Sequence, residues 1–344
     1  MQRKLLACLL AACCLLTNGC WLLDKFVKQS VSIPQVLGPL DKAETPQLLA
    51  EVNRNAAARS VKSKVYLEFE DLSAAGAGIA EKYKRADGLV YVQRPGQIYL
   101  SIQGPLSTKI AEMTSNDNTF RVAVYQGEQR FRRFVQGRNA SDYSKLQIDD
   151  VDGAKNDKMM QRDKQRVGVF SKIRPQHLIE GLLLNPIIPA PAANFLYVRS
   201  ETREEEDDTR PAAKPGARVA RGYYLLDEVA SNGDGTGRVV RRFWFDRWQG
   251  IHLARVQIFR PDGAMETDIT YGENKPVGAN GAMLPTRVGI RRPQENYGLV
   301  ITYQTPEEVT LDKEFDPAIF VLLNKPGLPE LNLEELLSRR PEEQ

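Results

Sequence analysis

Apolar and polar residues alternate one by one through many short segments of the chain, and this pattern constrains the fold more than any other feature. Ile98, Leu100 and Ile102 alternate with more polar residues, and so do Leu299 and Ile301 near the C-terminus. Pro, Gly, Asn and Asp separate the segments and predict tight turns. Short turns join antiparallel neighbours. We expect roughly eleven to thirteen strands in one antiparallel sheet, which at that length must curl.

Two segments repeat apolar residues at helical spacing instead. The first runs from Thr45 to Arg59, with Thr45 as N-cap and Pro46 at the first helical position. The second begins at Arg174-Pro175 and runs to about Leu184. An apolar concave face would expose more apolar area than a soluble monomer tolerates, so we expect the helices to cover it. Their apolar stripes form the predicted lid: Leu48, Leu49, Val52, Leu178, Ile179, Leu182 and Leu183.

These patterns predict an α+β fold that is mainly β. The expected architecture is a long curved antiparallel half-barrel sheet, with two or three helices covering its concave face. Its inward-facing strand residues are the candidate lining of a cavity between sheet and helices: Ile98, Leu100, Ile102, Leu299 and Ile301.

The first residues are typical of a signal peptide. Arg3 and Lys4 precede an apolar run of twelve residues at 5–16, which is shorter than the ~20 residues of a membrane-spanning helix. The start resembles a bacterial lipoprotein signal, in which the cysteine after the cleavage point is lipidated. We expect Cys20 to carry the lipid, with Cys13 as the alternative. A secretory signal cleaved without lipidation, or an uncleaved anchor, is also compatible with the pattern.

The resemblance to lipoprotein signals implies a protein attached to a membrane by its N-terminal lipid. Trp21 follows Cys20 where the inner-membrane retention signal has Asp, so the resemblance implies the periplasmic face of the outer membrane. All four cysteines lie in the first twenty residues. The rest of the chain therefore has no disulfide and no cysteine-bound zinc.

Changes in composition predict the organisation of the mature chain. We expect a signal peptide at 1–19, a tether at 20–44, a half-barrel domain at 45–325 with exposed insertions at 139–166 and 201–221, and a C-terminal tail at 326–344. The tail contains a short helix from Leu333 to Leu337, which an Asn332–Glu335 capping box opens.

Several function classes find no support in the sequence. The net charge of +3 is too small for a typical nucleic-acid binder, and two histidines are too few for a multi-histidine metal centre. Nucleophile-elbow, zinc-protease and nucleotide-binding motifs are absent from the sequence. We therefore expect a monomeric protein that is not an enzyme, with no cofactor, no metal and no catalytic residue. His177 and His252 are interpreted as surface or structural histidines.

A few short motifs resemble the bacterial lipoprotein-localisation family, which comprises a periplasmic carrier and an outer-membrane receptor. They are the strand–turn–strand segment 89–100, Gly104-Pro105-Leu106, Arg174-Pro175 and Leu284-Pro285. The resemblance covers most of residues 45–325. It implies a half-barrel whose helices close an acyl-binding cavity. The receptor also has a protruding loop with an exposed leucine, and the loop 73–79 with Ile79 is the candidate counterpart.

The leading hypothesis is an outer-membrane lipoprotein that binds acyl chains such as palmitate, carried by lipoproteins or other lipids, for envelope localisation or transport. The alternative is a protein-interaction or envelope-sensor module on the same fold, with no lipid ligand. An enzyme that uses paired carboxylates is a third interpretation. A tightly filled interior would count against transport.

Overall fold

The computed structural model describes residues 34–72, 81–82, 85–126, 129, 132–141, 143, 174–187, 195–210 and 212–338. The predicted signal peptide 1–19, the lipidation candidates Cys20 and Cys13, the loop 73–79 and nearly all of the insertion 139–166 lie outside the described residues. In the described part of the chain, no helix is long and apolar enough to cross a membrane.

The chain divides into two compact units. The first comprises Met1–Pro39 and Arg203–Gly222, and the second comprises Leu40–Thr202 and Tyr223–Gln344. Two long strands, β9 (Phe195–Asp207) and β10 (Arg218–Ser231), contribute residues to both units.

The first unit shows that the described end of the predicted tether is a paired strand. β1 (Gln35–Val36) pairs in parallel with Val219 and Ala220 of β10. The backbone N–H of Leu37 then donates to the Ala220 carbonyl at 3.0 Å. The sequence predicted a tether over 20–44 and no strand, because a strand of two residues is too short for alternation of apolar and polar residues to reveal it.

The predicted insertion 201–221 is also largely strand. β9 and β10 run through most of it and leave 208–217 as their connection. Cross-strand ion pairs stabilise this solvent-exposed hairpin: Arg218 pairs with Glu205 and Asp207, and Arg221 pairs with Glu206. The acidic run alone did not predict a strand, because the arginines that pair with it lie on the other strand.

The second unit contains most of the sheet. Its remaining strands are β2 (Ser60–Asp71), β3 (Glu81–Lys82), β4 (Ala86–Gln93), β5 (Gln97–Gln103), β6 (Lys109–Ser115), β7 (Thr119–Val124), β8 (Arg133–Arg138), β11 (Gly237–Asp246), β12 (His252–Phe259), β13 (Met265–Val277), β14 (Ala282–Arg292), β15 (Tyr297–Tyr303), β16 (Thr310–Leu311) and β17 (Glu330–Asn332). In the described chain, 17 strands join in one sheet. The count exceeds the predicted range because β1, β3, β16 and β17 have only two or three residues.

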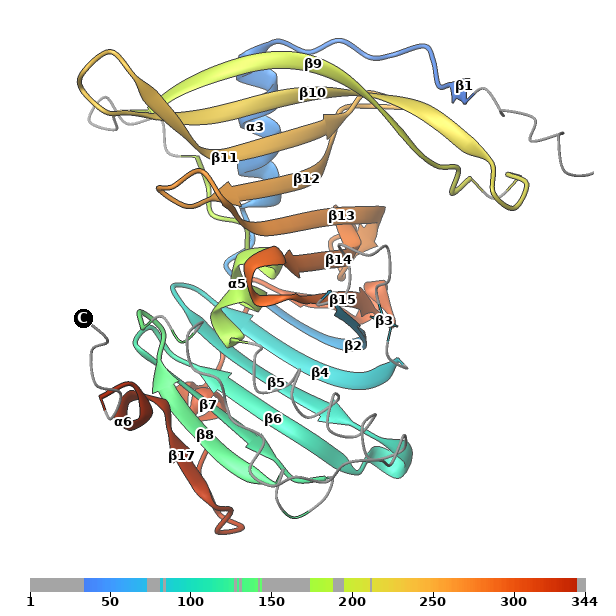
Figure 1. Ribbon diagram of the computed structural model, residues 1–344. Helices are drawn as coiled ribbons and strands as arrows, with labels where there is room; N and C mark the ends of the chain where they lie inside the picture. The colour runs from blue at the N-terminus through green and yellow to red at the C-terminus, as the bar shows by residue number, and fades with distance from the viewer. Residues whose placement is uncertain are drawn as a thin grey trace, which may run out of the picture. The chain divides into compact units, whose positions relative to one another are not determined.

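Strands that are consecutive in the sequence pair antiparallel from β10 to β15 and from β4 to β8. β2 lies between β15 and β4 and so joins the two series. The pairings β1–β10 and β17–β8 are parallel. Within the second unit the sheet is curved and open (Figure 1), so the predicted half-barrel is confirmed.

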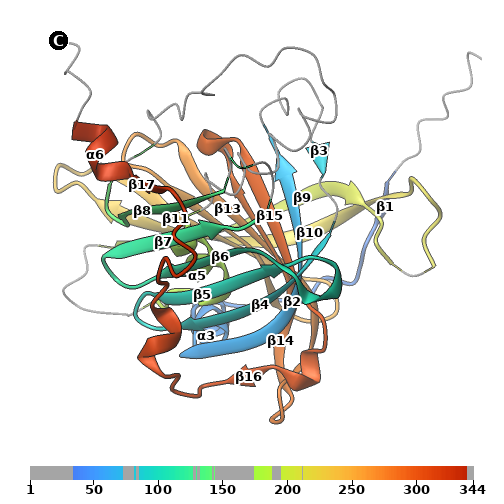
Figure 2. The same cartoon turned by 90° about the horizontal axis from the view of Figure 1, so that it is seen from below.

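Two helices cover the concave face of the sheet in the second unit (Figures 1 and 2). α3 (Thr45–Asn55) contacts β12, and α5 (Pro175–Leu182) contacts β14, β5 and β6. A third helix, α6 (Leu333–Ser338), contacts β8 and begins where the sequence placed it. Short 3₁₀ turns η2 (Pro105–Ser107), η4 (Pro293–Glu295), η5 (Pro306–Glu308) and η6 (Pro317–Phe320) complete the unit.

The first helix differs from its predicted bounds at both ends. Its N-cap is Glu44, whose backbone N–H donates to the side chain of Gln47 at 2.7 Å, so Thr45 is already helical. The helix ends at Asn55 and not at Arg59. Arg94 donates to the backbone carbonyls of the residues that follow, and these bonds hold them in a non-helical path.

The residues predicted to line the interior are part of one hydrophobic core. All five strand residues are buried, as are four residues of the predicted lid, Leu48, Val52, Leu178 and Leu183. Leu49, Ile179 and Leu182 are partly buried and pack against the same core.

Candidate functional site

The helix α5 is the element that could open the concave face, because it is short and its two ends have clear sequence causes. Pro175 occupies the first turn, where a missing N–H costs nothing. Asn185-Pro186 stops the helix, since the residue before a proline avoids helical dihedral angles. In between, Gly181 packs so closely on β14 that an added Cβ would lie 2.5 Å from Cδ1 of Ile290. Glycine at this position therefore sets the distance between helix and sheet.

Polar groups of α5 fix its N-terminal half. The side chain of Gln176 donates to the Asn139 carbonyl at 2.9 Å. His177 is buried, and its Nδ1 lies 2.6 Å from the Tyr297 hydroxyl of β15. Burial, with nearby Arg292 and Arg174, holds the pKa of His177 well below its usual range, so the ring is neutral at pH 7. The predicted structural role of His177 thus agrees with its position.

Glu180 is the second titratable group on α5. Burial raises the pKa of Glu180 to about 7. The Arg292 guanidinium lowers this pKa, whereas the negative charges of Glu266 and Glu295 raise it further. Arg292 itself pairs with Glu295 at 2.8 Å and donates to the Thr267 hydroxyl at 2.5 Å. The helix therefore lies on a small buried network of mixed charge, whose balance depends on pH.

Arg94, in the turn between β4 and β5, ties the ends of the two helices together. Its guanidinium donates to the carbonyls of Ala56 and Ala58, each at 3.2 Å, just after α3. The same group donates to the Leu184 carbonyl at 2.6 Å and to the Asn185 side chain at 3.3 Å, just after α5. The side chain of Arg94, the arginine latch, thus holds both covering segments against the sheet.

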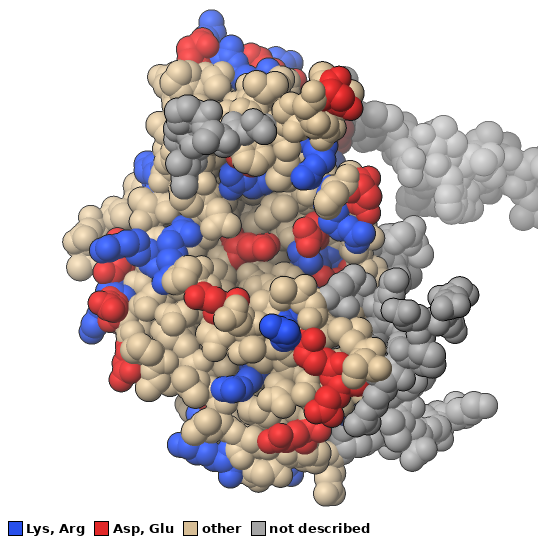
Figure 3. All heavy atoms as spheres, turned by 90° about the vertical axis from the view of Figure 1, so that its left-hand side faces the viewer, with Lys and Arg blue, Asp and Glu red and all other residues tan. Residues whose placement is uncertain are grey.

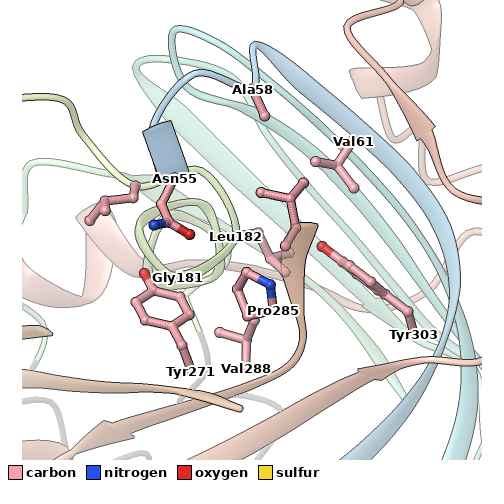
Figure 4. Close-up of a pocket in the computed structure, with 11 residues that line it drawn as sticks. Asn55, Ala58, Val61, Gly181, Leu182, Tyr271, Pro285, Val288 and Tyr303 are labelled. Carbon is pink, nitrogen blue, oxygen red and sulfur yellow. The ribbon is translucent and has the colours of Figure 1, made fainter. Parts of the chain in front are cut away.

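A pocket lies beside this latch, where the C-terminal ends of α3 and α5 meet β13, β14 and β15 (Figure 4). Its volume is about 30 Å³, and its lining is mostly apolar. The polar lining groups come from Asn55, Tyr271 and Tyr303. A space of this size accepts one or two water molecules. An acyl chain requires α5 or the end of α3 to move.

The predicted cavity-lining residues do not line this pocket. Ile98, Leu100, Ile102, Leu299 and Ile301 lie in the packed core, and of the predicted lid only Leu182 reaches the pocket. Sequence reasoning missed Asn55 and Tyr271. Tyr303 follows Leu299 and Ile301 on one strand face, so alternation alone could have found it.

The surface carries one exposed apolar residue of unusual conformation. Leu106, between β5 and β6, is 100% exposed and has a φ of 58°, in the left-handed region that leucine rarely adopts. The face in Figure 3 shows acidic and basic side chains interspersed, with broad uncharged areas between them. No group of three or more metal-ligating side chains occurs in the described chain.

No family model matches the chain, and no curated protein matches it. Solved structures do show similarity. A DUF1329 family protein from Desulfovibrio piger has a TM-score of 0.40 and 11% identity, covering 82% of this chain and 96% of its own. A LolA superfamily protein from Nitrosomonas europaea has a TM-score of 0.39 and 12% identity, covering 82% and 99%.

A third similar structure is the putative outer membrane lipoprotein-sorting protein domain from Vibrio parahaemolyticus. It has a TM-score of 0.37 and 8% identity, covering 81% of this chain and 95% of its own. At these scores and identities the likeness carries no argument about the superfamily or about a ligand.

Proposed function

We propose that the chain is a lipid-binding lipoprotein of the bacterial envelope. It takes up acyl chains between the concave face of the sheet and the helices α3 and α5. The observation that supports this most directly is the construction of the cover: an eight-residue helix over an apolar sheet face, held by polar bonds and one arginine latch. The proposal requires no chemistry and assigns no catalytic residue.

The described conformation corresponds to the closed state in this proposal. Apolar burial contributes ~0.8 kcal/mol per CH₂, so a palmitoyl chain supplies on the order of 10 kcal/mol. That free energy must exceed the loss of the Arg94 bonds and of the packing between α5 and the sheet. A ligand that binds the open state shifts the equilibrium only by its differential affinity for that state.

A reversible covalent lock tests whether α5 must move. Gly181 and Ile290 are in direct contact, and the chain after Cys20 has no cysteine, so G181C/I290C introduces one pair that can close. We expect the oxidised protein to exclude a fluorescent fatty acid and the reduced protein to bind it. The two single variants are the matched controls. Equal uptake by the oxidised and reduced forms would refute a lid at α5.

Attachment to the outer membrane, with the chain on its periplasmic face, is part of the same proposal. The signal-like start supports it, with Cys20 as the lipidated residue and Cys13 as the alternative. Labelling of cells with a palmitate analogue tests it. C20S should lose the label and leave the membrane fraction, whereas C13S should retain both. The opposite result moves the anchor to Cys13.

The filled interior favours a second candidate function, a protein-interaction or sensor module without a lipid ligand. A pocket of about 30 Å³ holds no acyl chain as it stands. The edge strand β9 offers an exposed apolar surface at Phe195, Leu196 and Val198 for a partner. In this case the oxidised G181C/I290C protein would capture the same envelope partner as the wild type, and purified protein would carry no lipid in native mass spectrometry.

A further inference from the structure

The pocket at the ends of α3 and α5 contains a hydroxyl group that the fold leaves unused. The Tyr271 hydroxyl is buried and has no hydrogen-bond partner in the described part of the chain. Figure 4 shows it at the pocket end of the ring, directed toward Asn55. A buried hydroxyl without a partner destabilises the fold. A polar atom of a molecule that entered the pocket would satisfy it.

Two further polar groups face the same space. The Tyr303 hydroxyl enters the pocket from β15, turned toward the other lining side chains in Figure 4. The side-chain amide of Asn55 donates hydrogen bonds to the backbone carbonyl and to the carboxylate of Glu51, at 2.9 and 3.0 Å. Its side-chain carbonyl therefore remains as an acceptor. The pocket thus presents two hydroxyl donors and one amide acceptor within an apolar lining.

All lining groups are uncharged, which limits the chemistry of a ligand. Burial raises the pKa of both Tyr271 and Tyr303, so both remain protonated donors at neutral pH. The Arg94 guanidinium, which bonds to the backbone of the lining residues Ala58 and Leu184, already donates to three carbonyls and to Asn185. Glu180 adds negative character near Tyr271. A carboxylate would be desolvated here without a cation, which is costly.

We propose that this pocket recognises the neutral carbonyl group at the head of an acyl chain, in an amide or an ester, and rejects the free carboxylate. The two tyrosine hydroxyls donate to the carbonyl oxygen, and the Asn55 carbonyl accepts the N–H of an amide. The inference rests on the proposed function, because the attached chain needs the space that α5 vacates. The inference goes beyond the proposed function by naming the head group and the three residues that select this group.

The test compares three probes with the same chain length: N-palmitoylethanolamine, monopalmitoylglycerol and palmitate. Each displaces a fluorescent fatty-acid methyl ester from the full chain at pH 8. We expect the amide to bind best and palmitate worst. Each hydroxyl–carbonyl bond contributes roughly five- to tenfold in affinity. The variant Y271F/Y303F should therefore lose most of the preference over palmitate, and N55A should lose the preference of amide over ester.

Matched variants separate this inference from a failure of folding or of the proposed function. Y91F changes a tyrosine whose ring contacts Tyr99 and Phe315, away from the pocket, and should keep the order of the probes. Y271F should melt at or above the wild-type temperature, because its hydroxyl has no partner to lose. If no probe binds the wild type, the proposed function fails. If the probes bind and Y271F/Y303F keeps their order, the hydroxyls do not select the head group and this inference alone is overturned.

Discussion

The Nδ1 atom of His177, on the helix that covers the concave face, lies 2.6 Å from the hydroxyl oxygen of Tyr297 on β15. This hydrogen bond joins cover and sheet inside the core, where both side chains are buried. A neutral imidazole suits the bond, and a charged one would be desolvated beside Arg292 and Arg174. The pairing therefore makes the closure of α5 sensitive to acid.

Acidification below pH 6.5 should weaken the fold through His177. The folded pKa is depressed, so between that value and the ordinary 6.5 the unfolded chain binds a proton that the native chain does not. The stability that depends on neutral His177 is fully present above pH 6.5. Below that pH the unfolding free energy falls by up to about 1.4 kcal/mol per pH unit. Urea unfolding at pH 7.5 and 5.0 measures this fall, and H177Q should reduce it.

The chain provides its own control, since His252 is the second of its two histidines. H252Q should retain the full acid-dependent loss of stability. An equal effect of H177Q and H252Q would show that the loss arises elsewhere.

Glu180 should respond to pH in the opposite direction. Its folded pKa of about 7 exceeds the ordinary 4.5, so the native chain holds a proton that the unfolded chain releases in this window. The stability that Glu180 contributes is fully present below pH 4.5. It is lost as the pH rises through 7, which lowers the unfolding free energy by about 3 kcal/mol. E180Q should therefore be more stable than the wild type at pH 8 and nearly equal at pH 4.

The exposed Glu307 is the matched control for this substitution. E307Q should leave the unfolding free energy unchanged at both pH values. Hydrogen exchange at the amides of α5 gives a local readout, with more protection in E180Q than in the wild type at pH 8. A uniform change over the whole sheet would contradict a local role of Glu180.

Local patterns predicted the elements, and their successes and failures have physical causes. Alternation placed Ile98, Leu100 and Ile102 on the inward face because a strand with one buried face fixes its own register. The start of α5 followed from Pro175, whose effect acts within one or two residues, whereas the helix ends at Leu182, two residues before the predicted Leu184.

Local patterns do not reveal pairing between residues that lie far apart in the sequence. The cross-strand pairs Glu205–Arg218 and Glu206–Arg221 convert a charged stretch into strand, and no property of the acidic run alone reveals them. The pocket depends in the same way on Asn55 and Tyr271, which only the fold brings together. The signal peptide and lipid attachment remain predictions, because those residues lie outside the described part of the chain.

Substitution of Gly181 should loosen the cover. An added Cβ would lie 2.5 Å from Cδ1 and 2.8 Å from Cγ1 of Ile290, a buried residue that has little room to shift. Overpacking of this kind costs about 1–3 kcal/mol. We expect G181A to lower stability by that amount and to speed uptake of a fluorescent fatty acid severalfold in stopped-flow measurements. In G181A/I290V, which restores space, both effects should diminish. Unchanged uptake together with lower stability would separate α5 from ligand entry.

Substitution of Leu106 should raise the stability of the fold and weaken its binding to a membrane. Its left-handed backbone costs about 1 kcal/mol for leucine and less for asparagine, so L106N should raise the unfolding free energy by up to that amount. The fully exposed side chain can instead bury in a bilayer, which contributes roughly 1.5–3 kcal/mol. We therefore expect L106N to reduce sedimentation with phosphatidylethanolamine–phosphatidylglycerol vesicles about tenfold. Leu323 is 58% exposed and has no such backbone, so L323N serves as control and should change neither quantity appreciably. Equal vesicle binding by L106N and the wild type would leave the strained leucine without a role at the membrane.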